Sequence, residues 1–144
     1  MVAKLTRTSF KKIPSNIFEQ ASKKFLLEEG LKPVTHNYRC RFGEIDLIMR
    51  DISTLVFIEV RFRKNRLYGG GAASVDKRKQ KRLSLTAAHY LQCKHYNGNC
   101  RFDVIDVSYT KTTIQAEQNC RVLPTTNNNE RAPTLHFDWI QNAF

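Results

Sequence analysis

The chain of 144 residues is long enough for one domain but short for two, and its hydrophobic content of 41% argues against disorder. Its 24 Lys and Arg outnumber 13 Asp and Glu, and the net charge of +11 attracts polyanions, most commonly nucleic acid. The sequence lacks the apolar run of a membrane span or a secretory signal, so we expect a cytoplasmic protein with no membrane partner.

The N-terminal part predicts a basic arm followed by one helix. Residues 1–13 are rich in positive charge and should form a loose arm. A helix is predicted to begin at residues 14–16 and to run to about Glu29, where Gly30 ends it. One side of this helix is apolar at helical spacing and should pack on the body of the protein: Ile17, Phe18, Ala21 and Phe25.

Three extended segments come next, and the last two predict a hairpin. Residues 34–41, 44–50 and 54–63 are rich in β-forming side chains, and Gly43 marks a turn or a close backbone approach. Strict alternation predicts the two faces of the first hairpin strand: Ile45, Leu47 and Met49 on one, Glu44, Asp46 and Ile48 on the other.

The second half predicts a strand–helix–strand step. Residues 64–73 contain three consecutive glycines and should be an irregular loop. A helix capped by Ser74 or Asp76 should run to about Lys94, and residues 101–109 should form a fourth strand. A crossover of this length favours parallel pairing of the strands that it joins.

The C-terminal part has a weaker pattern. Residues 112–117 predict an edge strand, residues 124–134 a mobile loop, and residues 135–144 a short helix that docks on the body. The order α-β-β-β-α-β with a C-terminal segment is typical of a single α/β domain whose mixed sheet is flanked by helices.

The four cysteines do not follow a familiar pattern: Cys40, Cys93, Cys100 and Cys120. They form neither a CxxC pair nor a compact disulfide framework, so we expect reduced thiols. A zinc site that combines them with histidines stays an alternative, although the spacing matches no known ligand pattern.

The predicted hairpin brings two acids into register. A two-residue loop at residues 52–53 places Asp46 opposite Glu59 and Glu44 opposite Arg61. Two carboxylates that face each other across a sheet cost up to about 1 kcal/mol, and a divalent cation such as Mg²⁺ would relieve that repulsion. A three-residue loop would instead shift the register by one residue and separate the two acids.

Positive side chains surround this acid pair. Arg61 could orient a water nucleophile or stabilise phosphate charge, and other basic residues could hold a phosphodiester backbone. These are Arg63, Lys64 and Arg66 after the strand, and Lys77, Arg78, Lys79 and Lys81 in the second helix. The same acids and bases could instead form ion pairs on a solvated sheet face, and spacing alone leaves both interpretations open.

The hairpin motifs resemble those of a bacterial family. Residues 43–48 read GEIDLI and residues 55–63 read LVFIEVRFR, similar to the GEIDLI and FVEVK-x-R signatures of the YraN-like family of small endonuclease-like proteins. RFDV at residues 101–104 and WIQNAF at residues 139–144 are similar to its later motifs, so the resemblance covers nearly the whole chain. The family in turn resembles PD-(D/E)xK nucleases and Holliday-junction resolvases, which implies a restriction-endonuclease-like fold.

The resemblance implies a metal site. Asp46 and Glu59 correspond to the acids of the two motifs, and Glu19 to the helix glutamate that would complete a site for Mg²⁺ or Mn²⁺. Gly43 and Glu44 would support the same site. Glu19 keeps a structural alternative, since it could close a capping interaction at the helix start.

One position departs from the family pattern, because Arg61 stands where the motif has lysine. Arginine keeps the charge but has a different shape and does not release a proton. Lys77 or Lys79 of the second helix is a candidate replacement. Asp103 and Asp106 are expected to be ordinary strand residues.

Three functions are compatible with the sequence. The leading hypothesis is a metal-dependent endonuclease that hydrolyses phosphodiester bonds of structured or branched DNA, with DNA favoured over RNA and a homodimer suggested by family analogy. The second is a catalytically impaired protein that binds nucleic acid, because Arg61 replaces the motif lysine. The third is a scaffold for an acidic protein, which leaves the two acids unexplained.

Overall fold

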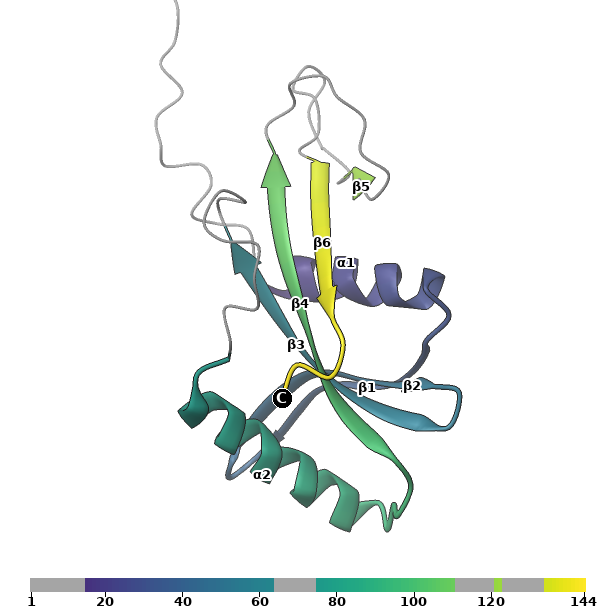
Figure 1. Cartoon of the computed structure of the whole chain (residues 1–144), viewed down its shortest axis with the longest axis vertical. Helices are drawn as coiled ribbons and strands as arrows, with labels where there is room; N and C mark the ends of the chain where they lie inside the picture. The colour runs from purple at the N-terminus through teal and green to yellow at the C-terminus, as the bar shows by residue number, and fades with distance from the viewer. Residues whose placement is uncertain (1–14, 64–74, 111–120, 123–133) are drawn as a thin grey trace, which may run out of the picture.

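The computed structural model describes residues 15–63, 75–110, 121–122 and 134–144 (Figure 1). Within them, helices and strands follow in the order α1 (Ser15–Glu28), β1 (Lys32–Cys40), β2 (Gly43–Asp51), β3 (Thr54–Arg63), α2 (Lys77–Cys93), β4 (Cys100–Thr110), β5 (Arg121–Val122) and β6 (Thr134–Ile140). The predicted order α-β-β-β-α-β is confirmed. The predicted arm, the glycine-rich loop and the edge strand at residues 112–117 lie outside the described residues.

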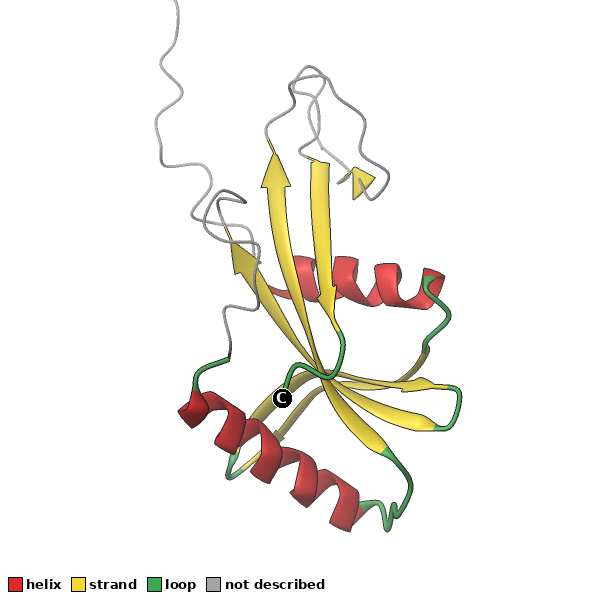
Figure 2. Cartoon of the chain, in the orientation of Figure 1, coloured by secondary structure: helices red, strands yellow, loops and turns green. Residues whose placement is uncertain are grey.

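One mixed sheet joins the described strands in the order β1-β2-β3-β4-β6-β5. β3 and β4 are parallel, and the other neighbouring pairs in this sheet are antiparallel. The parallel pair confirms the predicted crossover, because α2 lies between β3 and β4 in the chain. Figure 2 shows the two helices on either side of the twisted sheet.

Alternation along β3 divides the hydrophobic core into two clusters. Val56 and Ile58 belong to the α1-side cluster, which contains the buried face of α1. Leu55 and Phe57 belong to the α2-side cluster, which contains the buried face of α2. Because successive side chains of a strand point to opposite faces, the sheet itself separates the two helices.

Both helices end or begin at the residues that the sequence indicates. Gly30, just beyond α1, has a φ of +95°, and the Leu31 N–H donates a hydrogen bond to the Leu26 carbonyl at 3.0 Å. The Asp76 side chain accepts a 2.9 Å hydrogen bond from the Lys79 N–H, which confirms Asp76 as the cap of α2. Neither of these two helices has the length and apolar character needed to cross a membrane.

The predicted alternation of β2 is wrong at one position. Ile45 packs in the α2-side cluster with Ile48, three residues further along, although strict alternation would put them on opposite faces. Leu47 keeps the predicted face and packs in the α1-side cluster. The neighbouring strand β1 is irregular at the same level, where Asn37 has a φ of +51°. The alternation of β2 side chains between the two faces of the sheet is therefore interrupted by one residue around Asp46.

The C-terminal segment contains a strand and not the predicted helix. Thr134–Ile140 form β6, antiparallel to β4, so the predicted loop ends before Thr134 and its other residues lie outside the described part of the chain. Leu135 and Phe137 are buried in the α1-side cluster, whereas Asp138 is exposed. His136, between Leu135 and Phe137, is buried as well, so burial does not alternate along this short segment, and its aromatic residues also suit a docked helix.

A buried carboxylate fastens the C-terminal segment to β4. The Asp103 side chain is 0% exposed and accepts hydrogen bonds from Arg101 Nε, Trp139 Nε1 and the Asn142 N–H at 3.0, 3.0 and 3.1 Å. Arg101 also donates a 2.7 Å hydrogen bond to Asp51 at the end of β2. A buried charge is tolerated only when it is paired and hydrogen-bonded, so we assign Asp103 a structural role.

Replacing Asp103 by Ala should lower the free energy of unfolding by about 3–5 kcal/mol, because Trp139 Nε1 and the Asn142 N–H lose their acceptor and Arg101 loses one of its two carboxylate partners. Denaturant unfolding followed by the fluorescence of Trp139 measures the loss. Asp138→Ala on the exposed side of β6 is the control and should change the free energy of unfolding by less than about 0.5 kcal/mol. Equal losses in the two variants would contradict this role of Asp103.

Candidate functional site

Strands β2 and β3 pair near their hairpin turn and diverge at the candidate site. The predicted register is confirmed, but the paired stretch ends at Leu47–Ile58. Beyond that point the Val60 N–H donates a 2.8 Å hydrogen bond to the Asp46 carboxylate. The register alone predicted that Asp46 and Glu59 form a backbone pair. They do not, and they lie instead where the two strands separate.

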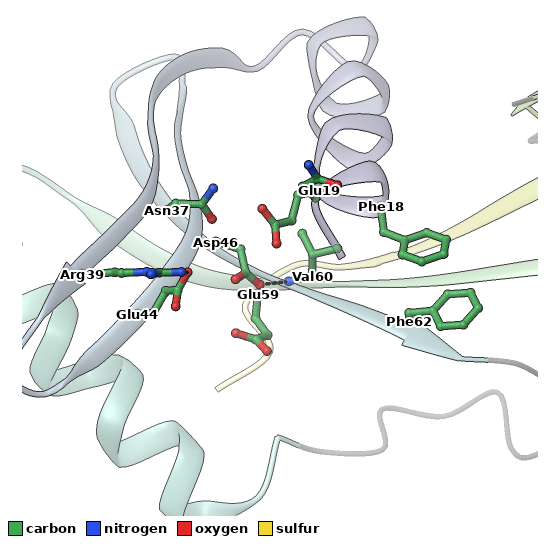
Figure 3. Close-up of a pocket in the computed structure, with 10 residues that line it drawn as sticks. Phe18, Glu19, Asn37, Arg39, Glu44, Asp46, Glu59, Val60 and Phe62 are labelled. Atoms are coloured by element: carbon green, nitrogen blue, oxygen red, sulfur yellow. Dashed lines mark hydrogen bonds and ion pairs between the residues drawn. The ribbon is translucent and has the colours of Figure 1, made fainter. Parts of the chain in front are cut away.

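An open cavity of about 450 Å³ lies at this divergence (Figure 3). Four elements contribute its lining: Asn16, Phe18 and Glu19 from α1, Asn37 and Arg39 from β1, Glu44 and Asp46 from β2, and Glu59, Val60 and Phe62 from β3. The three acids of the predicted site, Glu19, Asp46 and Glu59, thus line one cavity.

Part of this lining could not be found from the sequence. Asn37 and Arg39 belong to no motif, and the irregular backbone of β1 at Asn37 leaves no clear sequence signal. Phe18 stacks on Phe62 with 4.1 Å between ring centroids. The helical spacing of Phe18 indicated that it packs on the sheet, but not that it does so beside the acids.

Asp46 is the most clearly perturbed acid of the cavity. Burial raises the pKa of its carboxyl from 3.8 to about 7, and the nearby Glu59 and Glu19 carboxylates add to the rise. The hydrogen bond from the Val60 N–H and the charge of Lys79 lower the pKa of Asp46 but do not cancel the rise. A perturbed carboxyl among other acids in a cavity is typical of functional sites.

A lysine from α2 contacts the second acid. The Lys79 ammonium forms an ion pair with the Glu59 carboxylate, whose side chain is 7% exposed. The Lys79 side chain is 47% exposed, so the ammonium lies between a buried acid and the solvent. Of the two lysines that the sequence offered as replacements for the motif lysine, Lys79 is the one that the structure brings to the acids.

Arg61 and Glu44 do not take their predicted places. β2 leaves β3 before Glu44 reaches the level of Arg61 and stays paired with β1, where Arg39 is the register partner of Glu44. Glu44 accordingly forms a 2.9 Å ion pair with Arg39. Arg61 is in register with Asp106 of β4 and is not among the residues that line the described cavity. Its role at a reacting phosphate stays a prediction.

Glu19 points into the cavity. α1 begins at Ser15, and Figure 3 shows the Glu19 carboxylate directed toward Asp46 and not back to the helix start. Its negative charge also contributes to the raised pKa of Asp46. Of the two alternatives that the sequence left open, this position favours the site residue over the capping interaction.

The oxygen donors of the cavity suit a hard divalent cation. Asp46 and Glu59 could hold Mg²⁺ or Mn²⁺ together with water, and Glu19 could add a third oxygen. Among the described residues, no three His, Cys, Asp or Glu side chains stand close enough to hold a metal as they are, cysteine–histidine combinations included. The donors fit the ion in chemical type, and Glu59 would have to share or release Lys79 to bind it.

Apart from Lys79, the residues predicted to bind nucleic acid fall into two groups. Three are exposed on the first turns of α2: Lys77, Arg78 and Lys81. In the other group, Arg63 forms a 3.3 Å ion pair with Asp106 of β4. Lys64 and Arg66 lie outside the described residues.

Gly43 lies where the β1–β2 hairpin meets α2. Its φ is +155°, and a Cβ built on it would lie 3.2 Å from Thr86 Oγ1 and 3.7 Å from the Arg82 guanidinium. The close backbone approach predicted for Gly43 is confirmed, and it brings the helix that carries Lys79 against the strand that carries Asp46.

Asp46→Asn should stabilise the metal-free protein more at pH 8 than at pH 5. Since the pKa of Asp46 is raised from 3.8 to about 7, the folded state holds this proton more tightly than the unfolded state. The resulting stabilisation is complete below about 4 and is lost as the pH rises through about 7. Asparagine carries no such charge and keeps an acceptor for the Val60 N–H.

Thermal unfolding at the two pH values measures this difference. Glu29→Gln, at an exposed position just beyond α1, is the control and should show no comparable dependence on pH. A gain from Asp46→Asn that is the same at pH 5 and pH 8 would contradict the raised pKa.

Comparisons with known proteins agree with one another. The model described as "Uncharacterised protein family UPF0102" matches residues 18–107, a range that includes both hairpin motifs. A UPF0102 protein of Psychromonas ingrahamii is 50% identical over 101 residues, which cover 70% of this chain and 83% of that protein. One of Aeromonas hydrophila is 44% identical over 130 residues, with coverages of 88% and 81%. One of Nitrosomonas eutropha is 43% identical over 126 residues, with 88% of each chain covered.

Proposed function

Since this chain belongs to the uncharacterised protein family UPF0102, the family that its YraN-like motifs indicated, we propose a function from its own site. The protein is a metal-dependent endonuclease that hydrolyses phosphodiester bonds in structured or branched DNA. The observation that carries this proposal is the meeting of Glu19, Asp46 and Glu59 in one cavity of a strongly basic protein.

The acids are arranged for an ion rather than for stability. Asp46 is partly buried beside two other carboxylates, and both the loss of solvent and their charge raise its pKa to about 7. Like charges held together in a partly buried place cost folding free energy, and a divalent cation would remove that cost. A solvated set of surface ion pairs, the alternative that the sequence left open, does not account for the burial of Glu59 or for the raised pKa of the partly buried Asp46.

Hydrolysis needs little else from the protein. The oxygen of a water molecule forms a new bond to phosphorus, the bond to the leaving sugar oxygen breaks, and that oxygen takes up a proton. A bound divalent cation supplies the activation of water and the stabilisation of the leaving oxygen. Asp46 and Glu59 would hold the cation, with Glu19 oriented toward Asp46 to fix its position or that of a bound water.

The basic start of α2 supplies a surface for the nucleic-acid backbone. Lys77, Arg78 and Lys81 are exposed in its first turns, on the helix whose Lys79 reaches the acids. Phosphate contacts of this kind position a substrate without reading its sequence. They would present a phosphodiester to the cavity and would not depend on a bound metal.

Purified protein should cleave junction, flap or single-stranded DNA in the presence of Mg²⁺ or Mn²⁺. Asp46→Asn and Glu59→Gln should each slow cleavage by at least about 100-fold, because even residues that only support metal ligands cost 10- to 100-fold when replaced. Both variants should still bind DNA in the absence of metal. Glu29→Gln should cleave at the wild-type rate, and equal cleavage by wild type and an Asp46/Glu59 double variant would reveal a contaminating nuclease.

A second candidate function, binding without cleavage, is favoured by the ion pair that already occupies Glu59. Without metal, the logarithm of DNA affinity should fall linearly with the logarithm of salt concentration, by about 0.9 per phosphate contacted. Replacing Lys77, Arg78 and Lys81 together by Ala should reduce that slope by about 2–3. Steep salt dependence without cleavage under any divalent ion would support binding alone, and binding insensitive to salt would argue against both functions.

A further inference from the structure

We infer that Lys79 is an exchangeable counter-ion and a catalytic residue of this site. It neutralises Glu59 while no metal is bound, and it transfers to a phosphate oxygen of the substrate when a divalent cation takes its place. This inference rests on the proposed endonuclease function for its second half, whereas its first half concerns the metal-free protein alone.

The contact with Glu59 is one that the metal-free site needs. The Glu59 side chain is 7% exposed, and a buried carboxylate without a nearby cation carries a large desolvation penalty. The Lys79 ammonium, which reaches Glu59 from the side of the solvent, offsets part of that penalty. Its charge also opposes the rise in the pKa of Asp46, so it acts on both central acids.

Two other arginines near the cavity have carboxylate partners of their own. Arg39 lines the cavity but forms an ion pair with Glu44, and its own side chain is 73% exposed. Arg63 forms an ion pair with Asp106 of the neighbouring strand. Lys79, by contrast, forms an ion pair directly with Glu59, one of the two central acids.

Lys79 combines a fixed backbone with a movable charge. Asp76 holds the Lys79 N–H at 2.9 Å and accepts the Gln80 N–H at 2.9 Å through its carbonyl, while Gln80 Nε2 donates to Val75 O at 2.7 Å. These bonds hold the first turn of α2 in place. The four-carbon side chain beyond them is flexible and about half exposed, so the ammonium can change partners without a change of backbone.

Exchange follows from the charges. A divalent cation between Asp46 and Glu59 would satisfy Glu59 and repel the ammonium, because like charges at short range in a poorly solvated site repel strongly. The nearest strong acceptors would then be the oxygens of a phosphodiester presented at the cavity. From there Lys79 would stabilise the negative charge that develops as water attacks phosphorus. Lys79 would therefore move to the phosphate only when both the divalent cation and the substrate are bound.

The test uses Lys79→Met, which removes the charge but keeps most of the apolar stem of the side chain. Lys94→Ala is the matched control, because it removes one positive charge at the opposite end of the same helix. Two quantities are measured for each full-length protein: the affinity for Mn²⁺ alone by titration calorimetry, and the rate of single-turnover DNA cleavage. Circular dichroism and thermal unfolding confirm that each variant is folded.

Lys79→Met should bind Mn²⁺ several-fold more tightly than wild type, because the ion no longer displaces an ammonium. It should nevertheless cleave DNA on the order of 100-fold more slowly. Lys79→Arg should recover part of the rate, and Lys94→Ala should resemble wild type in both measurements. A residue that only supports the fold would weaken Mn²⁺ binding and cleavage together.

The outcomes separate this inference from the proposed function. Unchanged or weaker Mn²⁺ binding by Lys79→Met overturns the counter-ion role, and a wild-type cleavage rate for this variant overturns the catalytic role while the endonuclease stands. If no protein cleaves DNA but Lys79→Met binds Mn²⁺ more tightly, the endonuclease proposal and the catalytic role fail and the counter-ion remains.

Discussion

The hydrogen bond from the Val60 N–H to the Asp46 carboxylate is the contact on which the rest of the site depends. It forms just beyond the end of the β2–β3 ladder, so a side chain satisfies a backbone donor that a carbonyl would otherwise have to satisfy. The strands can therefore part inside the protein without leaving that donor unpaired. Continued regular pairing would close the opening that Glu19 and Glu59 enter from two different elements.

The opening gathers several carboxylates in one place, in a chain whose net charge is strongly positive. Asp46 is partly buried with a raised pKa, and Glu59 is buried against an ammonium from another element. Such arrangements lower stability and persist where the surrounding structure is strong enough to hold them. Here two apolar clusters, one on each face of the sheet, supply that strength.

Local patterns in the sequence predicted the element order and the hairpin register, because the two-residue turn and the alternation in β3 are local properties. The place of Glu19 beside Asp46 and Glu59 came instead from the family resemblance. The direction of Ile45 could not be predicted, since it depends on the strands parting beside Asp46. The partner of Glu44 was wrong for the same reason. In the sequence, Lys79 is one of several similar basic residues of α2, and only the packing of that helix shows that Lys79 contacts Glu59. Strand β6 was mistaken for a helix because its pairing with β4 is distant in the chain.

Gly43 has a consequence that reaches beyond its own turn. The missing side chain lets α2 rest directly on the β1–β2 hairpin at Thr86, two helical turns from Lys79. A methyl group here would lie 3.2 Å from Thr86 Oγ1, so this side chain or the helix would have to move by a few tenths of an ångström. Because Lys79 belongs to the same helix, the space left by Gly43 contributes to the close approach between the lysine and the acids.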